Sequence, residues 1–405
     1  MIATIDDSRG VAATITTSAA AATRWEVVVV GAGPAGAATA LRLARGGRKV
    51  VLVDRDGMPR PKVCGCCLST RARDELRSLL PGPADRSIVG EVPLDVVRLV
   101  AAGRAVRLPL PAGGVVSRES LDAALVRAAI AAGADWLPHV TVAGITEPTA
   151  AGARLVVAGR TATGDCRLTA AHVVIAAGLA DHVRVPDATN VRAARPGSRM
   201  GVGCVLDDDA GDLAAGELVM AVGRSGYCGI VRLEDGRIDV AAAVDRRAVA
   251  AADGPAGAVA AILREAGADR AGVGITSAAL ATATCRATPP LTRAAPLVAG
   301  ATRRIFRVGD AAGYVEPFTG EGMGWALAGA RLVSDAVLDA ADPAAAYASA
   351  HAACFAPLHG RCRRVAAALR QPALVAAAIG AARVWPWAAR RAVPFVVGAA
   401  AAAPR

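Results

Sequence analysis

Aromatic side chains are scarce in this sequence of 405 residues: Phe, Trp and Tyr together make up 3% of it, although 54% of the residues are hydrophobic. Alanine, valine and leucine must therefore fill the core, and the length suffices for one large domain or two ordinary ones. Lysine is equally scarce, because Lys49 and Lys62 are the only two in a chain with a net charge of +11. Since no basic stripe is interleaved with aromatic residues, the composition argues against nucleic-acid binding.

Long hydrophobic runs are also missing. No uncharged apolar stretch reaches the length of about 18 residues that predicts a transmembrane helix. Residues 1–23 are small and polar and lack the apolar region of a secretory signal, so we expect a disordered leader there. Nine cysteines in a chain without such a signal predict a reducing, cytoplasmic setting without disulfides.

A glycine pattern follows the first short apolar run of the chain, residues 27–30. Gly31, Gly33 and Gly36 form G-x-G-x-x-G between a predicted buried strand and a predicted helix, and a second strand ends at Asp54. The three glycines permit a tight turn, a close approach of pyrophosphate and close packing of helix on strand, while the acid accepts hydrogen bonds from ribose. In this context the pattern strongly predicts a dinucleotide site.

A second motif lies far downstream. Residues 305–308 predict another buried strand, and Asp310 follows it directly. Gly320 and Gly322 then lead into a helix expected from about residue 322 to 339. An acid at a strand end suits the hydroxyls of a ribityl chain, and a helix N-terminus suits the flavin edge that gathers negative charge on reduction. FAD needs this second motif, whereas a nicotinamide cofactor does not.

The two motifs, "GAGPAG…VDRD" and "RVGDAAGYVEPFTGEG", resemble those of the flavoprotein superfamily of para-hydroxybenzoate hydroxylase. Within it, "DRDGMPRPKVCGCCLS" is similar to a loop of the geranylgeranyl reductase branch. The resemblance implies an α/β fold, in which a Rossmann-type FAD domain carries an inserted, mostly antiparallel substrate-domain sheet and a C-terminal helical segment. The implied cofactor-binding residues are Gly31, Gly33, Ala35, Gly36, Asp54, Arg55, Arg60, Lys62, Cys64, Gly65, Arg118, Val142, Asp310, Gly320 and Gly322.

Three cysteines stand in four positions of that loop: Cys64, Cys66 and Cys67. A structural zinc site needs a second ligand pair, and the next cysteine is Cys166, so we predict no metal. A redox pair, a set of small core residues, and a compact turn beside the flavin remain open, and the turn is favoured. The superfamily's mid-chain Asp-Gly motif is replaced here by Ala177-Gly178, which argues against direct reduction by NADPH.

The organisation expected from these motifs is discontinuous. The FAD domain takes residues 24–75, 113–190 and 283–335, the substrate domain takes 76–112 and 191–282, and helices follow in 336–405. Two hairpins are predicted in the substrate domain, with turns at Gly103 and at Asp235-Gly236.

The expected function is an FAD-dependent oxidoreductase that moves hydride between flavin and a carbon–carbon double bond of an apolar isoprenoid, lipid or polyketide-like substrate. A monooxygenase acting on an aromatic or polyketide ring and a non-catalytic flavin redox sensor are the alternatives. Tyr227, Cys66 and Glu316 are alternative proton donors, and the electron donor is NAD(P)H or a small carrier. The C-terminal segment, with Arg361, Arg363, Arg364 and Arg370 among apolar residues, is expected to cover a lipophilic substrate or to touch the inner face of a membrane. The alternative is a helical subdomain that only packs on the core.

Overall fold

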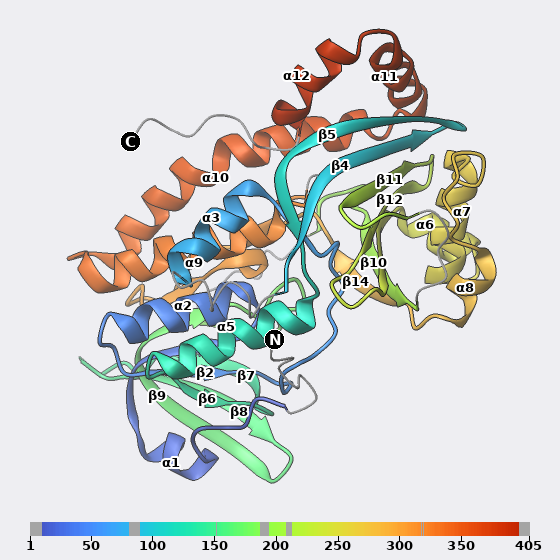
Figure 1. The fold of residues 1–405 in the computed structure, drawn as a ribbon. Helices are drawn as coiled ribbons and strands as arrows, with labels where there is room; N and C mark the ends of the chain where they lie inside the picture. The colour runs from blue at the N-terminus through green and yellow to red at the C-terminus, as the bar shows by residue number, and fades with distance from the viewer. Residues whose placement is uncertain are drawn as a thin grey trace, which may run out of the picture.

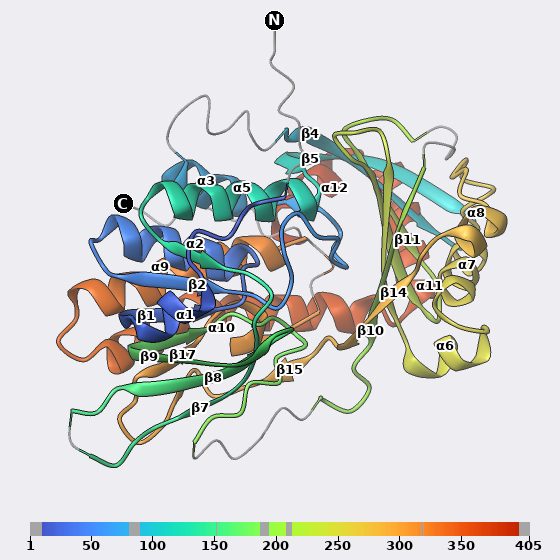
Figure 2. The same cartoon turned by 90° about the horizontal axis from the view of Figure 1, so that it is seen from below.

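The computed structural model describes residues 10–80, 90–150, 152–186, 194–207, 213–316, 318 and 320–396. Two eight-stranded sheets with their helices lie side by side, as Figures 1 and 2 show. The first sheet is that of the predicted FAD domain, and the second is the predicted substrate-domain sheet. The predicted fold class is confirmed.

The first sheet is built around a parallel core. Its order is β16-β17-β9-β1-β2-β6, and a β7–β8 hairpin extends β9. Strand β1 lies between β9 and β2, parallel to both, and its valines are buried because both faces of the sheet are covered. The strands are β1 (Arg24–Val30), β2 (Val50–Val53), β6 (Asp135–Leu137), β7 (Thr141–Thr146), β8 (Leu155–Thr161), β9 (Gly164–Ile175), β16 (Val298–Ala299) and β17 (Ile305–Arg307).

Helices that are distant in sequence gather beside this sheet. Helix α2 packs against both α5 and α9, and α9 also contacts α3 and α10 (Figure 1). Helix α9 begins and ends where the sequence predicts. The helices are α2 (Pro34–Arg45), α3 (Thr70–Leu79), α5 (Arg118–Ala131), α9 (Gly322–Asp339) and α10 (Pro343–Ala368).

The second sheet is antiparallel except where β11 runs parallel to β4. Its order is β14-β10-β13-β12-β11-β4-β5-β3, and both predicted hairpins, at Gly103 and at Asp235-Gly236, are present. A two-stranded pair, β15 (Arg293–Ala294) with β18 (Gly313–Tyr314), stands apart. The strands of the second sheet are β3 (Cys67–Leu68), β4 (Val92–Ala101), β5 (Arg104–Val115), β10 (Met200–Leu206), β11 (Glu217–Val222), β12 (Gly226–Arg232), β13 (Ile238–Val244) and β14 (Arg286–Pro290).

Helices cover both faces of the second sheet. Alternate residues of β11 point to opposite sides: Val219 and Ala221 join the cluster under α7, whereas Met220 and Val222 join the cluster under α11 and α12. Figure 1 shows α6 to α8 on one side of the sheet and α11 with α12 beyond β4 and β5. These helices are α6 (Arg246–Ala251), α7 (Pro255–Ala266), α8 (Ser277–Thr282), α11 (Pro372–Val384) and α12 (Pro386–Val396).

The N-terminal segment differs from the expected disordered leader. Residues 1–9 lie outside the described part of the chain, but residues 10–23 pack against the first sheet and include helix α1 (Thr17–Ala22). Ala20 is buried, and its carbonyl oxygen accepts a hydrogen bond from the indole of Trp25 at 2.9 Å. The Val11 N–H donates to the Met58 carbonyl. The sequence did not predict this packing because alanine is small enough to pack closely against a sheet. A run of small residues shows no apolar periodicity from which burial could be predicted.

Two edge strands also differ from the expected domain boundaries. Strands β3 and β14 come from segments assigned to the FAD domain, yet both pair into the substrate-domain sheet. Strand β3 begins at Cys67, the last cysteine of the loop that also carries Cys64 and Cys66, which we call the cysteine loop. This loop therefore passes from one sheet to the other.

Candidate functional site

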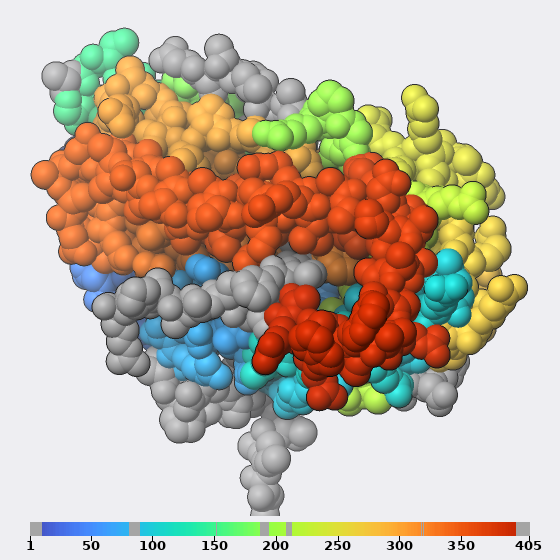
Figure 3. Space-filling model, turned by 90° about the horizontal axis from the view of Figure 1, so that it is seen from above, coloured from blue at the N-terminus to red at the C-terminus, as the bar shows by residue number. Residues whose placement is uncertain are grey.

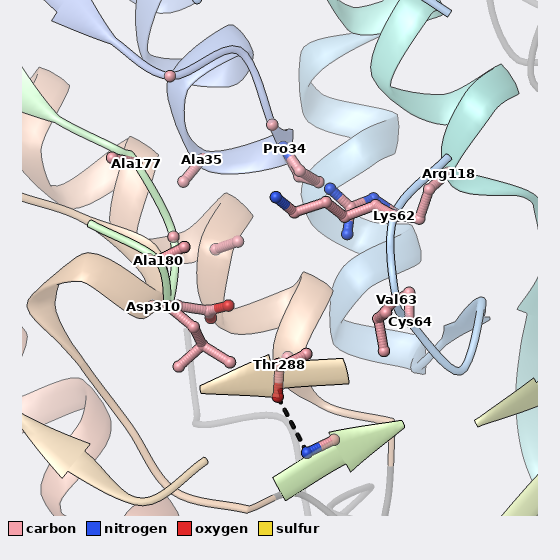
Figure 4. Close-up of a pocket in the computed structure, with 18 of the residues that line it drawn as sticks. Pro34, Ala35, Lys62, Val63, Cys64, Arg118, Ala177, Ala180, Thr288 and Asp310 are labelled. Atoms are coloured by element: carbon pink, nitrogen blue, oxygen red, sulfur yellow. Dashed lines mark hydrogen bonds between the residues drawn. The ribbon is translucent and has the colours of Figure 1, made fainter. Parts of the chain in front are cut away.

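A cavity of about 1080 Å³ lies between the two sheets. Its walls come from the loops after β1 and β2, the cysteine loop, the end of β9, the loop after β17 and the start of α9. Every predicted cofactor-binding residue except Gly36 lines it. In Figure 4, Lys62 and Arg118 lie beside Pro34, and Asp310, Ala177 and Ala180 stand across the opening from Cys64. The size is that of a cofactor or ligand pocket.

In the glycine loop after β1 and the first turn of α2, Gly31 and Gly36 leave no space for a side chain, whereas a Cβ on Gly33 would meet no atom closer than 3.5 Å. Gly31 has φ +103°, and a Cβ there would lie 2.5 Å from the carbonyl oxygen of Ala176. A Cβ on Gly36 would lie 1.7 Å from the carbonyl oxygen of Gly31, so Gly36 packs helix on strand and does not face the cavity. Gly33 caps α2, which begins at Pro34 and directs its N-terminus at the cavity. This arrangement suits a pyrophosphate.

Asp54 organises the neighbouring loop as well as facing the cavity. Its Oδ2 accepts hydrogen bonds from the Ala32 N–H at 2.6 Å and from Arg60 Nη2 at 2.9 Å. Its Oδ1 accepts one from the Asp56 N–H at 3.0 Å. An ionised carboxylate offers about four acceptor positions, so one position remains for a ribose hydroxyl. The predicted role therefore fits, with three protein donors that the sequence did not reveal.

The cysteine loop forms one wall of the cavity. The thiol of Cys66 donates to the carbonyl oxygen of Cys64 at 4.0 Å. A hydrogen bond from the Cys66 thiol to the Cys64 sulfur, helped by the charge of Arg118 against the effect of burial, lowers the pKa of the Cys64 thiol to about 6. The same hydrogen bond and burial raise the pKa of Cys66, whose φ is +51°. Arg118 is held by two hydrogen bonds to Asp122, at 2.9 and 2.8 Å. Cys64 thus presents thiolate character to the cavity at neutral pH.

Asp310 lies in the short 3-10 helix η1 (Gly309–Ala312), directly after β17. Burial raises the pKa of its carboxyl group to about 6, against the opposing charges of Arg118 and Lys62. Gly320 and Gly322 line the same end of the cavity, where α9 begins. A buried acid and a second helix N-terminus therefore stand at one end, with the glycine loop at the other, which fits the two halves of FAD.

The structure joins two of the three candidate proton donors. Tyr227 lines the cavity and is hydrogen-bonded to Glu316, which lies behind it and does not line the cavity. Arg199 Nη1 lies 3.3 Å from Glu316 Oε1, and its guanidinium lies over the Tyr227 ring at 5.5 Å from the centroid. Cys66 lines the cavity at the cysteine loop. Sequence reasoning missed Arg199, since no local pattern distinguishes it.

Burial sets the protonation of this pair. It raises the pKa of the Tyr227 phenol well above its ordinary value, and the charge of Glu316 adds to the effect. Burial also raises the pKa of Glu316, opposed by Arg199. The phenol therefore keeps its proton at neutral pH and, once its O–H bond rotates away from Glu316, can supply that proton to a reacting atom in the cavity.

Comparison with known proteins agrees with this geometry. The family described as FAD dependent oxidoreductase matches residues 26–61. The structure resembles a geranylgeranyl bacteriochlorophyll reductase-like protein from Thermoplasma acidophilum, with a TM-score of 0.66 and 17% identity over 86% of this chain and 88% of that one. The myxobacterial chondrochloren halogenase CndH gives a TM-score of 0.65 and 20% identity, with 92% of each chain covered. The fold is that of the FAD-dependent flavoproteins.

A shorter likeness to curated proteins accompanies this fold. This chain is 58% identical over 57 residues to a menaquinone reductase of Mycolicibacterium smegmatis, and 54% identical over 54 residues to one of Mycobacterium tuberculosis. These matches span only about a seventh of the curated relatives, 14% and 13% of their lengths. The predicted superfamily and its cofactor, FAD, are supported, whereas the comparisons leave the reaction type open.

A second cavity of about 270 Å³ adjoins the first. Cys67, Leu218, Met220 and Phe318 line both cavities. It lies between β4 and β5 and the helices α11 and α12, and most of its wall is aliphatic. Its apolar lining includes Leu94, Val97, Leu99, Val106, Leu108, Leu110, Val375, Ile379 and Val393. No sequence pattern predicted it, because its walls come from segments more than 250 residues apart.

Proposed function

We propose that this flavoprotein is a reductase that transfers hydride from flavin to a carbon–carbon double bond of an apolar, polyprenyl-type substrate. The second cavity carries the proposal, because it places a long apolar wall directly beside the cofactor cavity. A reaction on a small polar substrate does not require such a wall, whereas a long hydrocarbon chain gains free energy from each methylene that it buries.

The short likeness to menaquinone reductases supports the same substrate class. Menaquinones combine a quinone head with a long isoprenoid tail, and the tail offers carbon–carbon double bonds. A substrate whose reacting double bond lies near Tyr227, with the rest of its tail along Met220 and Leu218, matches the order of the two cavities.

The residues present fit the bound cofactor, which supplies the hydride. The glycine loop and the start of α2 would hold the pyrophosphate, Asp54 the ribose and Asp310 the ribityl hydroxyls. Tyr227 holds a proton for the second carbon of the double bond, and Glu316 with Arg199 fixes the direction of the phenol. The aliphatic wall of the second cavity excludes water from this space.

The electron donor is proposed to be a small carrier or a diffusing NAD(P)H molecule. The mid-chain position that carries Asp-Gly in the hydroxylases is Ala177-Gly178 here. The nearest acid in sequence, Asp181, is buried, accepts a hydrogen bond from the Val183 N–H and lies 3.6 Å from Arg307, outside the cavity lining. No acid from this loop is therefore available at the cavity to orient a nicotinamide.

Anaerobic reduction tests the reaction directly. The purified protein is reduced with dithionite under argon, freed of excess dithionite, and mixed in detergent with a polyprenyl quinone of long tail. Reoxidation of the flavin with two hydrogens added to the tail supports the proposal. If the flavin stays reduced until oxygen arrives and the product gains an oxygen atom, the chain is a monooxygenase. If the substrate does not reoxidise the flavin, oxygen yields no oxygenated product, and the protein changes conformation with the redox state of the flavin, the chain is a redox sensor.

A further inference from the structure

The C-terminal part of the chain has an extreme charge composition. Asp342 is the last acidic residue, and the 63 residues after it contain eight arginines and no Asp or Glu. A segment of this kind has no acidic side chains of its own to neutralise its arginines. It is therefore attracted to an anionic surface.

Large apolar side chains are exposed at the same place. Among the described residues, those that stand out as large, hydrophobic and exposed are Leu374 at 55%, Val384 at 67%, Trp385 at 56% and Trp387 at 64%. All four belong to α11, α12 or the junction between them, which Figure 3 shows in dark red on one face of the molecule. Exposed tryptophans beside arginines are typical of the interface between a bilayer and water.

The arginines near these tryptophans are exposed as well. Arg383, Arg390 and Arg391 are exposed, and the guanidinium of Arg391 lies 5.9 Å from the centroid of the Trp387 ring. We call these three arginines with the four apolar residues the hairpin patch. Of the arginines expected from sequence, Arg361, Arg363 and Arg364 lie on α10. Arg370 lies in the turn between α10 and α11 and is bound to Asp245 and to the Gly197 carbonyl.

The inner side of the same hairpin faces the second cavity. Val375 and Ile379 of α11 and Val393 of α12 line that cavity. The hairpin thus has apolar residues on both sides, one set toward the cavity and one toward solvent. Within the described residues no single helix is long and apolar enough to cross a bilayer; α10 and α11 meet those criteria only as a pair, across a bend of 97°.

We propose that the α11–α12 hairpin docks on an anionic lipid bilayer through the hairpin patch, and that the apolar tail of the substrate passes from the bilayer into the second cavity. The docking step rests on charge and exposure alone, whereas the passage of the tail rests also on the proposed function. Arginine guanidinium groups pair with lipid phosphates, and the tryptophans enter the headgroup region. The acyl region then meets the aliphatic side of the hairpin.

Vesicle flotation tests the docking without any turnover. The FAD-loaded protein is mixed with vesicles of phosphatidylcholine alone or of equal parts phosphatidylcholine and phosphatidylglycerol. We expect binding to the mixed vesicles that falls as salt rises. Because each arginine near an anionic surface contributes about fivefold to binding, R383Q/R390Q/R391Q should bind roughly a hundredfold more weakly. W385A/W387A should also lose binding.

A matched control removes the same number of positive charges from a different part of the surface. R246Q/R247Q/R264Q removes three exposed arginines from α6 and α7 and should bind as the unchanged protein does. Equal loss in both triple variants would overturn the proposal, because net charge alone would then explain binding. Failure of the unchanged protein to float, or burial of both tryptophans in a stable dimer detected by sedimentation, would also overturn it.

A variant that fills the second cavity tests the passage of the substrate tail separately from docking on the bilayer. Ala382 lines the second cavity, so A382F narrows it without touching the patch or the cofactor cavity. We expect A382F to keep its FAD and its vesicle binding, and to be reoxidised at least tenfold more slowly by a long-tailed quinone but not by a short-tailed one. Equal rates with both quinones would overturn the delivery step while leaving the reductase function intact. If the unchanged protein reduces neither quinone, the proposed function fails independently of the flotation result.

Discussion

The two sheets of this protein contrast in how they meet a ligand. The first sheet presents backbone and charge: the glycine loop after β1, two helix N-termini, and the acids Asp54 and Asp310. The second presents aliphatic side chains from β4, β5 and β11 together with the helices α11 and α12. Phosphates and hydroxyls require fixed donors and acceptors, which a short motif supplies. A hydrocarbon requires only a cavity of sufficient volume from which water is excluded, and many different sets of aliphatic side chains form such a cavity equally well.

Substitution of Gly36 by alanine should give the largest effect. It should destabilise the packing of α2 on the first sheet and leave the second sheet unchanged. The added Cβ would lie 1.7 Å from a backbone oxygen, so the helix must separate from the strand. We expect a loss of more than about 3 kcal/mol in the free energy of unfolding, together with loss of bound FAD. Chemical denaturation and the flavin absorbance measure both. Gly360→Ala on α10 is the control, since its Cβ would meet no atom closer than 4.0 Å and Gly360 does not line the cavity; equal damage there would contradict the explanation.

Glu217→Gln, in the second sheet, should lower the free energy of unfolding by about 3 kcal/mol without loss of bound FAD. Glu217 is buried and accepts hydrogen bonds from Arg98 and Arg107, each at 2.7 Å. Its loss leaves the buried charge of Arg98 without its carboxylate partner. Thermal unfolding and FAD content are the measurements. Asp165→Asn removes an exposed pair with Arg160 and should change stability by less than about 1 kcal/mol.

Asp310→Asn should stabilise the protein without FAD while weakening FAD binding. The pKa of Asp310 is raised from 3.8 to about 6, so the folded state holds this proton more tightly than the unfolded state does. The carboxylate therefore costs stability that grows as pH rises through this range and reaches about 3 kcal/mol above pH 6. Asparagine should recover up to that amount at pH 8 and nothing below pH 3.8. A gain that is independent of pH would contradict the assigned cause.

Cys66→Ala should give the smallest effect, at the loop that joins the halves. The hydrogen bond from Cys66 is the largest cause of the low pKa of Cys64, so its loss should raise that pKa by about one pH unit. The pH dependence of alkylation by iodoacetamide, located by peptide mass spectrometry, reports the change. Bound FAD should protect Cys64. Cys166→Ala, far from the loop, should leave the midpoint unchanged.

The same contrast explains what the sequence predicts. Gly31, Gly33, Asp54 and Asp310 each stand next to a strand or helix that their neighbours predict, and all four line the same cavity, so local patterns sufficed to bring them together. Glu316 and Tyr227 were named individually, but their contact was not predictable, because 89 residues separate them and Arg199 joins from a third segment. The second cavity was missed for the same reason. Aliphatic residues indicate burial and do not indicate which partner buries them.

The parallel pairing of β11 with β4 has a consequence for synthesis of the chain. Strands β4 and β5 leave the ribosome as a long hairpin, but their partner β11 follows only about a hundred residues later. At ordinary rates of translation this interval lasts roughly 10 s. During it, the edge of β4 is unpaired and the side that α11 later covers is open to other chains. The nascent protein therefore depends on dilution or on a chaperone at one definable moment, when about half of it has been made.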